Sequence, residues 1–155
     1  MRYAGLNKND MINGKGVCVS VWFQGCPHKC SGCHNPETWD PQGGTEINRD
    51  VLIEKIKKAI TANGIIRNVS ILGGEPLAPY NIDDLLYILK EIKEFSPTSL
   101  IYLWTGYIVE NFDEKQKQVW DYVDLIVDGP YIEALRDITL PLRGSSNQTI
   151  VIKEK

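Results

Sequence analysis

Three cysteines lie close together in the chain, at Cys26, Cys30 and Cys33, with the spacing C-x3-C-x2-C. A cubane iron–sulfur cluster is normally held by four cysteine thiolates, one for each iron. Three thiolates in one short loop would hold three irons and leave the fourth iron open to coordinate another molecule. An open iron indicates a catalytic role for the cluster, whereas four protein ligands would indicate a structural role.

Other uses of these cysteines remain open on the spacing alone. A zinc site of the Cys3His type is possible because His28 and His34 lie in the same loop, although three cysteines suffice for a cluster without them. A redox pair of Cys30 and Cys33 in a Cys-x-x-Cys pattern is also possible, but it leaves Cys26 unexplained. Disulfides are not expected, because no signal-peptide pattern precedes the cysteines and a reducing cytosol is the default compartment.

Length and composition favour a single soluble domain that spans residues 1–155. A chain of 155 residues can bury a sizeable core, and 43% hydrophobic with 24% charged residues is typical of a globular protein. The formal net charge of −3 argues against non-specific binding to nucleic acid or to anionic membranes. No apolar run approaches the roughly 18 residues of a membrane span, so we expect a cytoplasmic protein.

The hydrophobic pattern predicts strands that alternate with helices. The first helix is expected to be capped by Asn48 and to end at Asn63-Gly64, and Cys18, Trp22 and Trp104 are expected in the core. The predicted strands cover residues 17–24, 69–72, 100–104, 125–127 and 149–152, and two further helices cover 83–95 and 114–122. Residues 27–44 are rich in proline and glycine and predict a long functional loop.

Alternation of strands and helices predicts an α/β fold with a parallel sheet. Residues that could do chemistry follow the predicted strands: the cysteines, Gly73-Gly74-Glu75-Pro76, Thr105-Gly106-Tyr107 and Asp128-Gly129-Pro130. In parallel α/β folds the C-terminal ends of the strands form the active face. A closed eight-stranded barrel needs about 200–250 residues. We therefore expect an incomplete (β/α) barrel of five or six mostly parallel strands, open on one side.

The segment Gly73-Gly74-Glu75-Pro76 has two interpretations. It is a tight turn after a strand, as many Gly-Gly pairs are. Alternatively, the two glycines let backbone carbonyls approach a ligand closely, where they could bind an ammonium group. Glu75 would then bond a backbone group or the ligand.

The cysteine spacing together with Gly73-Gly74-Glu75-Pro76 resembles the radical S-adenosylmethionine (SAM) superfamily. The resemblance implies a [4Fe-4S] cluster on Cys26, Cys30 and Cys33, whose fourth iron is chelated by the amino and carboxylate groups of SAM. It also implies that one electron cleaves SAM to methionine and a 5′-deoxyadenosyl radical. Gly73, Gly74 and Glu75 would lie at the methionine end of SAM. No acid–base pair is visible in the sequence, and the cofactors would carry the chemistry.

A closer resemblance covers nearly the whole chain. It is to the family of activating proteins of anaerobic ribonucleoside-triphosphate reductase, which are relatives of the pyruvate formate-lyase activating enzyme. The matching segments are 13–16, 25–33, Trp39, Asp124–Tyr131 and Arg143–Gln148. This resemblance implies a glycyl radical installed on the large catalytic subunit of the reductase, and a flavodoxin-type electron donor.

The chain departs from the superfamily pattern before the third cysteine. Many members have an aromatic residue there, whose backbone meets the adenine of SAM, whereas this chain has Gly32. The resemblance still implies backbone contact from Gly32 through His34, with His34 a candidate for packing on the adenine. Thr105 and Asp128 match positions near the SAM site of the formate-lyase relative. The polar segment Arg143–Gln148 is either a solvated turn or a rim loop that touches SAM or the partner.

Overall fold

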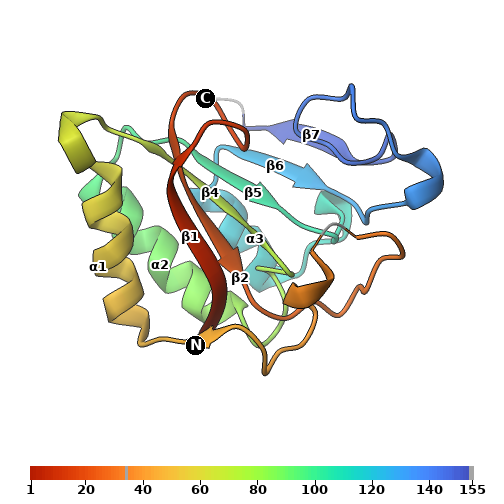
Figure 1. Cartoon of the computed structure of the whole chain (residues 1–155), viewed down its shortest axis with the longest axis horizontal. Helices are drawn as coiled ribbons and strands as arrows, with labels where there is room; N and C mark the ends of the chain where they lie inside the picture. Colours follow the sequence, from red (N-terminus) through yellow and green to blue (C-terminus); the bar gives the residue numbers. More distant parts are fainter. Residues whose placement is uncertain (34, 154–155) are drawn as a thin grey trace.

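A seven-stranded sheet runs through the computed structural model in the order β3-β1-β2-β4-β5-β6-β7 (Figure 1). The structure describes residues 1–33 and 35–153. The strands are β1 (Arg2–Asp10), β2 (Cys18–Phe23), β3 (Thr45–Glu46), β4 (Asn68–Gly73), β5 (Ile101–Trp104), β6 (Leu125–Asp128) and β7 (Thr149–Ile152). The helices are α1 (Arg49–Ile60), α2 (Ile82–Phe95) and α3 (Glu114–Tyr122).

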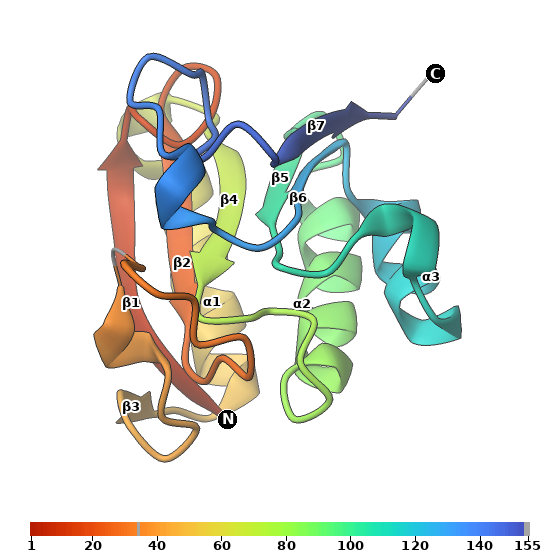
Figure 2. The same ribbon diagram turned by 90° about the vertical axis from the view of Figure 1, so that its right-hand side faces the viewer.

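The four central strands β2, β4, β5 and β6 run parallel to one another, and each outer strand is antiparallel to its neighbour. The three helices lie on one face of the sheet. The loop after β2 and the segment after β6 lie on the other face, as the two views at right angles show (Figures 1 and 2). The C-terminal ends of the parallel strands therefore meet at one edge of the sheet.

Alternation along the strands separates an apolar face from a mixed one. On β2, Val19, Val21 and Phe23 are fully buried and belong to the main hydrophobic core that α1 and α2 complete. The residues between them, Ser20 and Trp22, must point to the opposite face, because successive side chains of a strand alternate. In register, Ser20 pairs with Ser70, and Ser70 pairs with Tyr102. The face away from the helices thus carries polar and aromatic groups.

Most predicted elements are confirmed to within a few residues. Asn48 caps α1, since its side chain accepts hydrogen bonds from the backbone N–H groups of Asp50 (2.8 Å) and Val51 (3.4 Å). The helix ends at Ile60, before the predicted Asn63-Gly64, because a short 3₁₀ turn with Asn63 at φ 58° follows it. None of the described helices is long and apolar enough to cross a bilayer.

The number of strands was predicted too low. The sheet has seven strands, where five or six were expected, and only half of its neighbour pairs are parallel. The added strands are β1 and β3. β1 was not predicted because its sequence lacks an alternation of apolar and polar residues. The strand is mostly exposed or half-buried, and its backbone pairs with β2. The incomplete barrel itself stays a prediction.

The loop between β1 and β2 covers the mixed face of the sheet. Asp10, at the end of β1, accepts hydrogen bonds from the Ser20 hydroxyl (2.5 Å) and from the side chain of Asn13 (2.6 Å). The Ser70 hydroxyl donates to the backbone carbonyl of Asn13. A side chain at Gly14 would meet Cys18 Sγ at 2.8 Å. The buried carboxylate of Asp10 is thus the anchor of this loop.

We predict that Asp10→Asn destabilises the protein at neutral pH by about 1.5–3 kcal/mol. Burial acts to raise the pKa of the Asp10 carboxyl, but hydrogen bonds from Ser20, Asn13 and Ile12 outweigh it and leave the pKa below its ordinary value of 3.8. A lowered pKa contributes stability above the ordinary value, and this stability is lost as the pH falls through the folded-state pKa.

The difference between wild type and Asp10→Asn should therefore shrink as the pH drops below 3.8. Urea unfolding followed by circular dichroism over a pH series measures it. Asp121→Asn, at an exposed position of α3, serves as the matched control and should be neutral. A difference that does not change with pH would contradict this account of Asp10.

Candidate cysteine-lined active site

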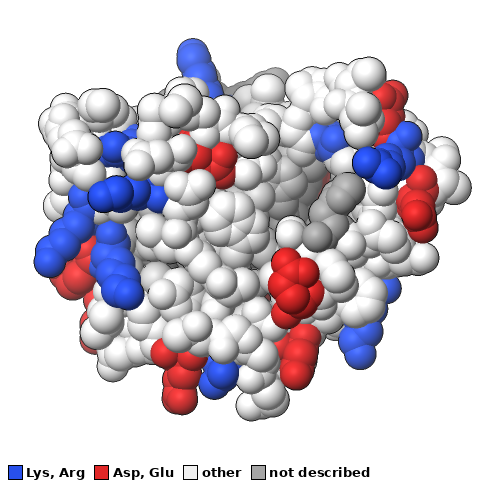
Figure 3. All heavy atoms as spheres, in the orientation of Figure 1, with Lys and Arg blue, Asp and Glu red and all other residues white. Residues whose placement is uncertain are grey.

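A cavity opens where the four parallel strands end, on the face of the sheet away from the helices. Figure 3 shows this side of the molecule hollowed to the right of centre, between the N-terminal strands and the segment after β6. All three cysteines of the C-x3-C-x2-C segment line the cavity, and so do four predicted site residues from the ends of β4 and β5. These are Gly73, Gly74, Glu75 and Thr105. The tertiary structure therefore brings Cys26 and Thr105, about 80 positions apart in the sequence, to the same cavity.

The cysteine loop is held at its base by backbone hydrogen bonds. The N–H of Gly25 donates to the carbonyl of Thr38 (2.6 Å), and the N–H of Cys26 donates to the carbonyl of Trp39 (3.0 Å). Between the second and third cysteines a turn is closed by the bond from Cys33 N to Cys30 O (3.1 Å). The loop thus leaves β2, turns and returns alongside its own start, which places all three thiols at one cavity wall.

Glu75 is fully buried, and both of its carboxylate oxygens accept hydrogen bonds from other parts of the chain. Oε1 accepts from the backbone N–H of Gly106 (2.7 Å) and lies 2.7 Å from His28 Nε2. Oε2 accepts from the Thr105 hydroxyl (2.8 Å) and from the backbone N–H of Leu77 (3.0 Å). The carboxylate therefore joins the ends of β4 and β5 to the cysteine loop. Glu75 was expected to bond either a backbone group or the ligand. In the structure its partners are backbone and side-chain groups of the protein.

His28 lies between the first two cysteines and is fixed in place. A carboxylate only accepts hydrogen bonds, so the His28 ring must donate from Nε2 to Glu75. The ring also packs edge-on against Tyr107, with 4.6 Å between centroids, and a side chain at Gly106 would strike it at 2.6 Å. His28 is thus a support of the loop, and its Nε2 is not free to bind zinc.

Gly73 and Gly74 allow a close approach of backbone to backbone, and the backbone they approach is that of the protein itself. A Cβ at Gly73, where φ is +123°, would lie 2.3 Å from the backbone nitrogen of Phe23. A Cβ at Gly74 would lie 2.4 Å from the carbonyl oxygen of Gly25 and 2.8 Å from that of Thr38. Backbone bonds from Gly74 N to Phe23 O (3.1 Å) and from Glu75 N to Gly25 O (2.7 Å) occupy this narrow gap. The Gly73-Gly74 pair therefore packs against the root of the cysteine loop while its outer side lines the cavity.

The donor set fits a cluster that takes three protein thiolates. All four cysteines are free, and Cys18 is fully buried on β2, as expected, where it does not line the cavity. Burial raises the pKa of the Cys26 thiol, and backbone N–H groups of Lys29 and His28 oppose the rise. Since only the thiolate binds metal, loading iron onto Cys26 must release a proton. Within residues 1–33 and 35–153, no three side chains of His, Cys, Asp or Glu lie close enough together to hold a metal ion as they stand.

Two predicted cofactor residues do not line the cavity. Gly32 is exposed, with φ +75°, and a side chain there would meet the Glu133 carboxylate at 2.6 Å. The carboxylate of Asp128 points elsewhere, because its Oδ2 accepts a hydrogen bond from the backbone N–H of Val109 (2.9 Å), and it borders a neighbouring groove. The next residue, Gly129, lines the cavity instead. The prediction for His34 lies outside the described residues.

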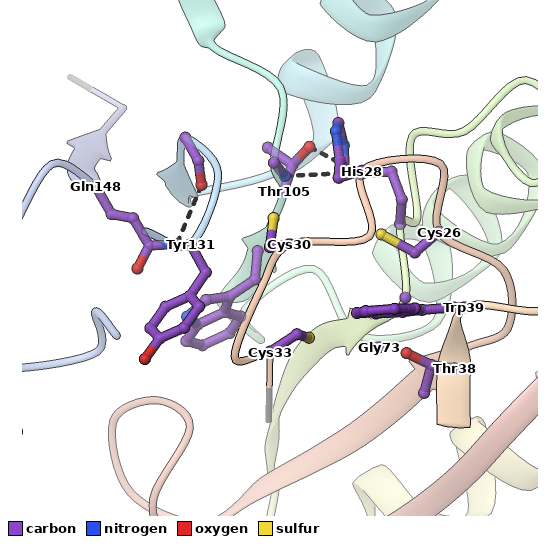
Figure 4. Close-up of a pocket in the computed structure, with 15 residues that line it drawn as sticks. Cys26, His28, Cys30, Cys33, Thr38, Trp39, Gly73, Thr105, Tyr131 and Gln148 are labelled. Carbon is purple, nitrogen blue, oxygen red and sulfur yellow. Dashed lines mark hydrogen bonds and ion pairs between the residues drawn. The ribbon is translucent and has the colours of Figure 1, made fainter. Parts of the chain in front are cut away.

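Aromatic side chains, which were not predicted as site residues, form part of the cavity wall (Figure 4). Trp104 lines the cavity, where a core position was expected, and its Nε1 donates to the carbonyl of Leu142 (2.8 Å). Trp22 is also only partly buried. Trp39 and Tyr131 line the cavity as well. The signal in the sequence was that Trp39 and Tyr131 belong to the segments that resemble the activating proteins. Nothing in their spacing showed that their side chains line the cavity.

The segment Arg143–Gln148 forms a hydrogen-bonded turn on the rim. The side-chain oxygen of Gln148 accepts from the N–H groups of Gly144 (2.8 Å) and Ser145 (3.2 Å), and its amide nitrogen donates to the carbonyl of Gly129 (3.0 Å). Gln148 also lines the cavity. Of the two interpretations of this segment, the rim loop agrees with its position.

Comparison with known proteins agrees with this geometry. The family model described as a 4Fe-4S single cluster domain matches residues 12–151. The chain is 35% identical over 151 residues to the anaerobic ribonucleoside-triphosphate reductase-activating protein of Salmonella typhimurium, and 35% identical over 154 residues to that of Escherichia coli strain K12; each match covers 97% of both chains. It is also 35% identical over 150 residues to the protein of the same name from Enterobacteria phage T4, covering 97% of this chain and 93% of the phage protein.

We predict that single Cys→Ala changes at positions 26, 30 and 33 each abolish a reconstituted iron–sulfur cluster, because each removes one of three thiolates. Cys18→Ala should retain the cluster at a packing cost of about 1–2 kcal/mol. Iron and sulfide analysis with visible absorption, after anaerobic reconstitution, measures both. A Cys18→Ala protein that folds but holds no iron would overturn the ligand assignment.

We also predict that Glu75→Gln destabilises the protein before any cluster is added, by about 2–4 kcal/mol. The amide replaces one accepting oxygen with an N–H₂ donor, which then faces donors in a fully buried site. Anaerobic urea unfolding of the cluster-free protein tests this, with Glu110→Gln at an exposed position as the control. Equal stability of Glu75→Gln and wild type would show that the carboxylate does not hold the loop.

Proposed function

The chain belongs to the family of anaerobic ribonucleoside-triphosphate reductase-activating proteins and carries a 4Fe-4S single cluster domain, and on this basis we propose that it is a radical SAM oxidoreductase. Its protein substrate is the large catalytic subunit of the anaerobic reductase, on which it generates a glycyl radical. The observation that carries the proposal is that three cysteines, without the fourth, line one cavity together with Gly73, Gly74 and Glu75.

Cys26, Cys30 and Cys33 would hold the cluster, and the Gly73-Gly74 turn would receive the methionine end of SAM beside it. When bound and reduced, the cluster and SAM together supply a 5′-deoxyadenosyl radical able to take a hydrogen atom from a glycine Cα. The chain itself supplies position. Glu75 and His28 hold the cysteine loop against the end of β4, and aromatic side chains form part of the cavity wall.

The substrate is proposed to be a protein because of where the cavity opens. Helices α1, α2 and α3 all lie on the other face of the sheet, and the sheet is proposed to form one wall of an open barrel (Figure 2). A glycine-bearing loop of a large partner can therefore reach the cavity. The resulting radical is stabilised by delocalisation onto the flanking amides. A flavodoxin-type protein is proposed as the electron donor.

The decisive experiment mixes the reduced, cluster-loaded protein anaerobically with SAM and the large reductase subunit. We expect a glycyl-radical doublet in the electron paramagnetic resonance spectrum. The Cys30→Ala protein and a sample without SAM are the matched controls, and both should give no doublet. Cluster-loaded protein that cleaves no SAM under these conditions would refute the radical mechanism.

The same assay separates the proposed partner from a related one. Pyruvate formate-lyase, the substrate of a relative of this family, replaces the reductase subunit in a parallel sample. A doublet on formate-lyase and none on the reductase would reject the reductase as partner and leave the radical mechanism standing. A zinc-binding module, the remaining alternative from the sequence, would give zinc and no labile sulfide on analysis.

A further inference from the structure

Two tryptophans line the cysteine cavity, and their indole N–H groups differ in one respect. Trp104 Nε1 donates a hydrogen bond of 2.8 Å to the carbonyl of Leu142. Trp39 Nε1 is buried and has no acceptor among the described residues. A buried donor without a partner costs about 1–3 kcal/mol and is rare in native proteins. The described residues therefore leave the Trp39 N–H without an acceptor, and a group bound in the cavity could supply one.

The position of Trp39 narrows the choice of acceptor. Trp39 lines the same cavity as the cysteines, and Figure 4 draws its ring near the thiols of Cys26 and Cys33 in that view. The backbone carbonyl of Trp39 accepts from Cys26 N (3.0 Å), and the backbone N–H of Trp39 donates to Pro36 O (3.1 Å). The indole is thus tied to the loop that carries the cluster ligands. Whatever Cys26, Cys30 and Cys33 bind is held next to it.

We propose that Trp39 is a positioning residue for the iron–sulfur cluster, and that its Nε1–H donates a hydrogen bond to a cluster sulfur, either a sulfide or a cysteine thiolate. This inference rests on the cysteine ligands assigned above. Sulfur in a cluster is an acceptor, and hydrogen bonds to it are among the factors that set the reduction potential. A donor favours the reduced cluster, which carries one more negative charge. Trp39 therefore makes the cluster easier to reduce.

The chain offers a matched pair of variants. Trp39→Phe keeps an aromatic ring and removes the unpaired N–H. Trp104→Phe removes an N–H from the same cavity, but this N–H already donates to the backbone carbonyl of Leu142. Both are compared with wild type as full-length, reconstituted protein in the absence of SAM, and the midpoint potential of the cluster is measured by a redox titration followed by electron paramagnetic resonance.

We expect the potential of Trp39→Phe to be more negative than that of wild type. A tenfold loss in the equilibrium constant for reduction, which is about the effect of one hydrogen bond to a charged group, corresponds to about 59 mV for a one-electron couple. Trp104→Phe should leave the potential unchanged. The inference is overturned if Trp39→Phe has the wild-type potential, if both variants shift equally, or if the shift appears only after SAM is added.

A second measurement does not depend on either variant folding. Wild-type protein labelled with ¹⁵N-tryptophan should show an indole ¹⁵N hyperfine coupling in the pulsed electron paramagnetic resonance spectrum of the reduced cluster. Trp104→Phe, where it folds, should retain this coupling. Wild-type protein that holds the cluster but shows no coupling refutes the role of Trp39 alone. Wild-type protein that assembles no cluster refutes the cysteine assignment and with it the proposed function.

Discussion

The carboxylate of Glu75 joins three parts of the chain that are far apart in the sequence. It is fully buried and takes hydrogen bonds from His28 in the cysteine loop, from Leu77 beyond β4, and from Thr105 and Gly106 at the end of β5. Such a group is stable in the interior only while all of its partners are present, because an unpaired buried charge is costly. The cysteine loop, which has little regular structure of its own, thereby gains the rigidity of two buried strands.

Close backbone packing also fixes the position of the cysteine loop, in addition to the hydrogen bonds of Glu75. Gly74 lies so near the carbonyls of Gly25 and Thr38 that a side chain has no room, and Gly106 lies equally near the His28 ring. These contacts place the root of the cysteine loop directly against the Gly73-Gly74 turn. The turn that we propose to receive SAM is thereby held next to the cysteines. The same glycines serve the architecture of the loop and the shape of the cavity.

The sheet divides the molecule into a packed half and a reactive half. Its apolar face is buried under the helices around Val21, Ile71 and Leu103. Its other face carries Ser20, Ser70 and Tyr102 toward the loop anchored by Asp10, and ends in the cysteine cavity. Stability and chemistry are thus supplied by opposite sides of the same strands, which allows a short chain to carry both.

The sequence by itself determined the helices, the parallel strands and the grouping of three cysteines in one loop, because periodicity, caps and residue spacing are local properties. The predicted extents of α2, α3 and β7 match the structure to within one residue. Local signals did not reveal β1, whose stability comes from pairing with β2. Only the tertiary structure decided that Glu75 bonds His28, that Asp128 turns away to Val109, and that Trp39 and Trp104 face the cysteines. These outcomes depend on which strand ends meet and which side chains then find partners, and distances across the fold are not encoded in any one segment.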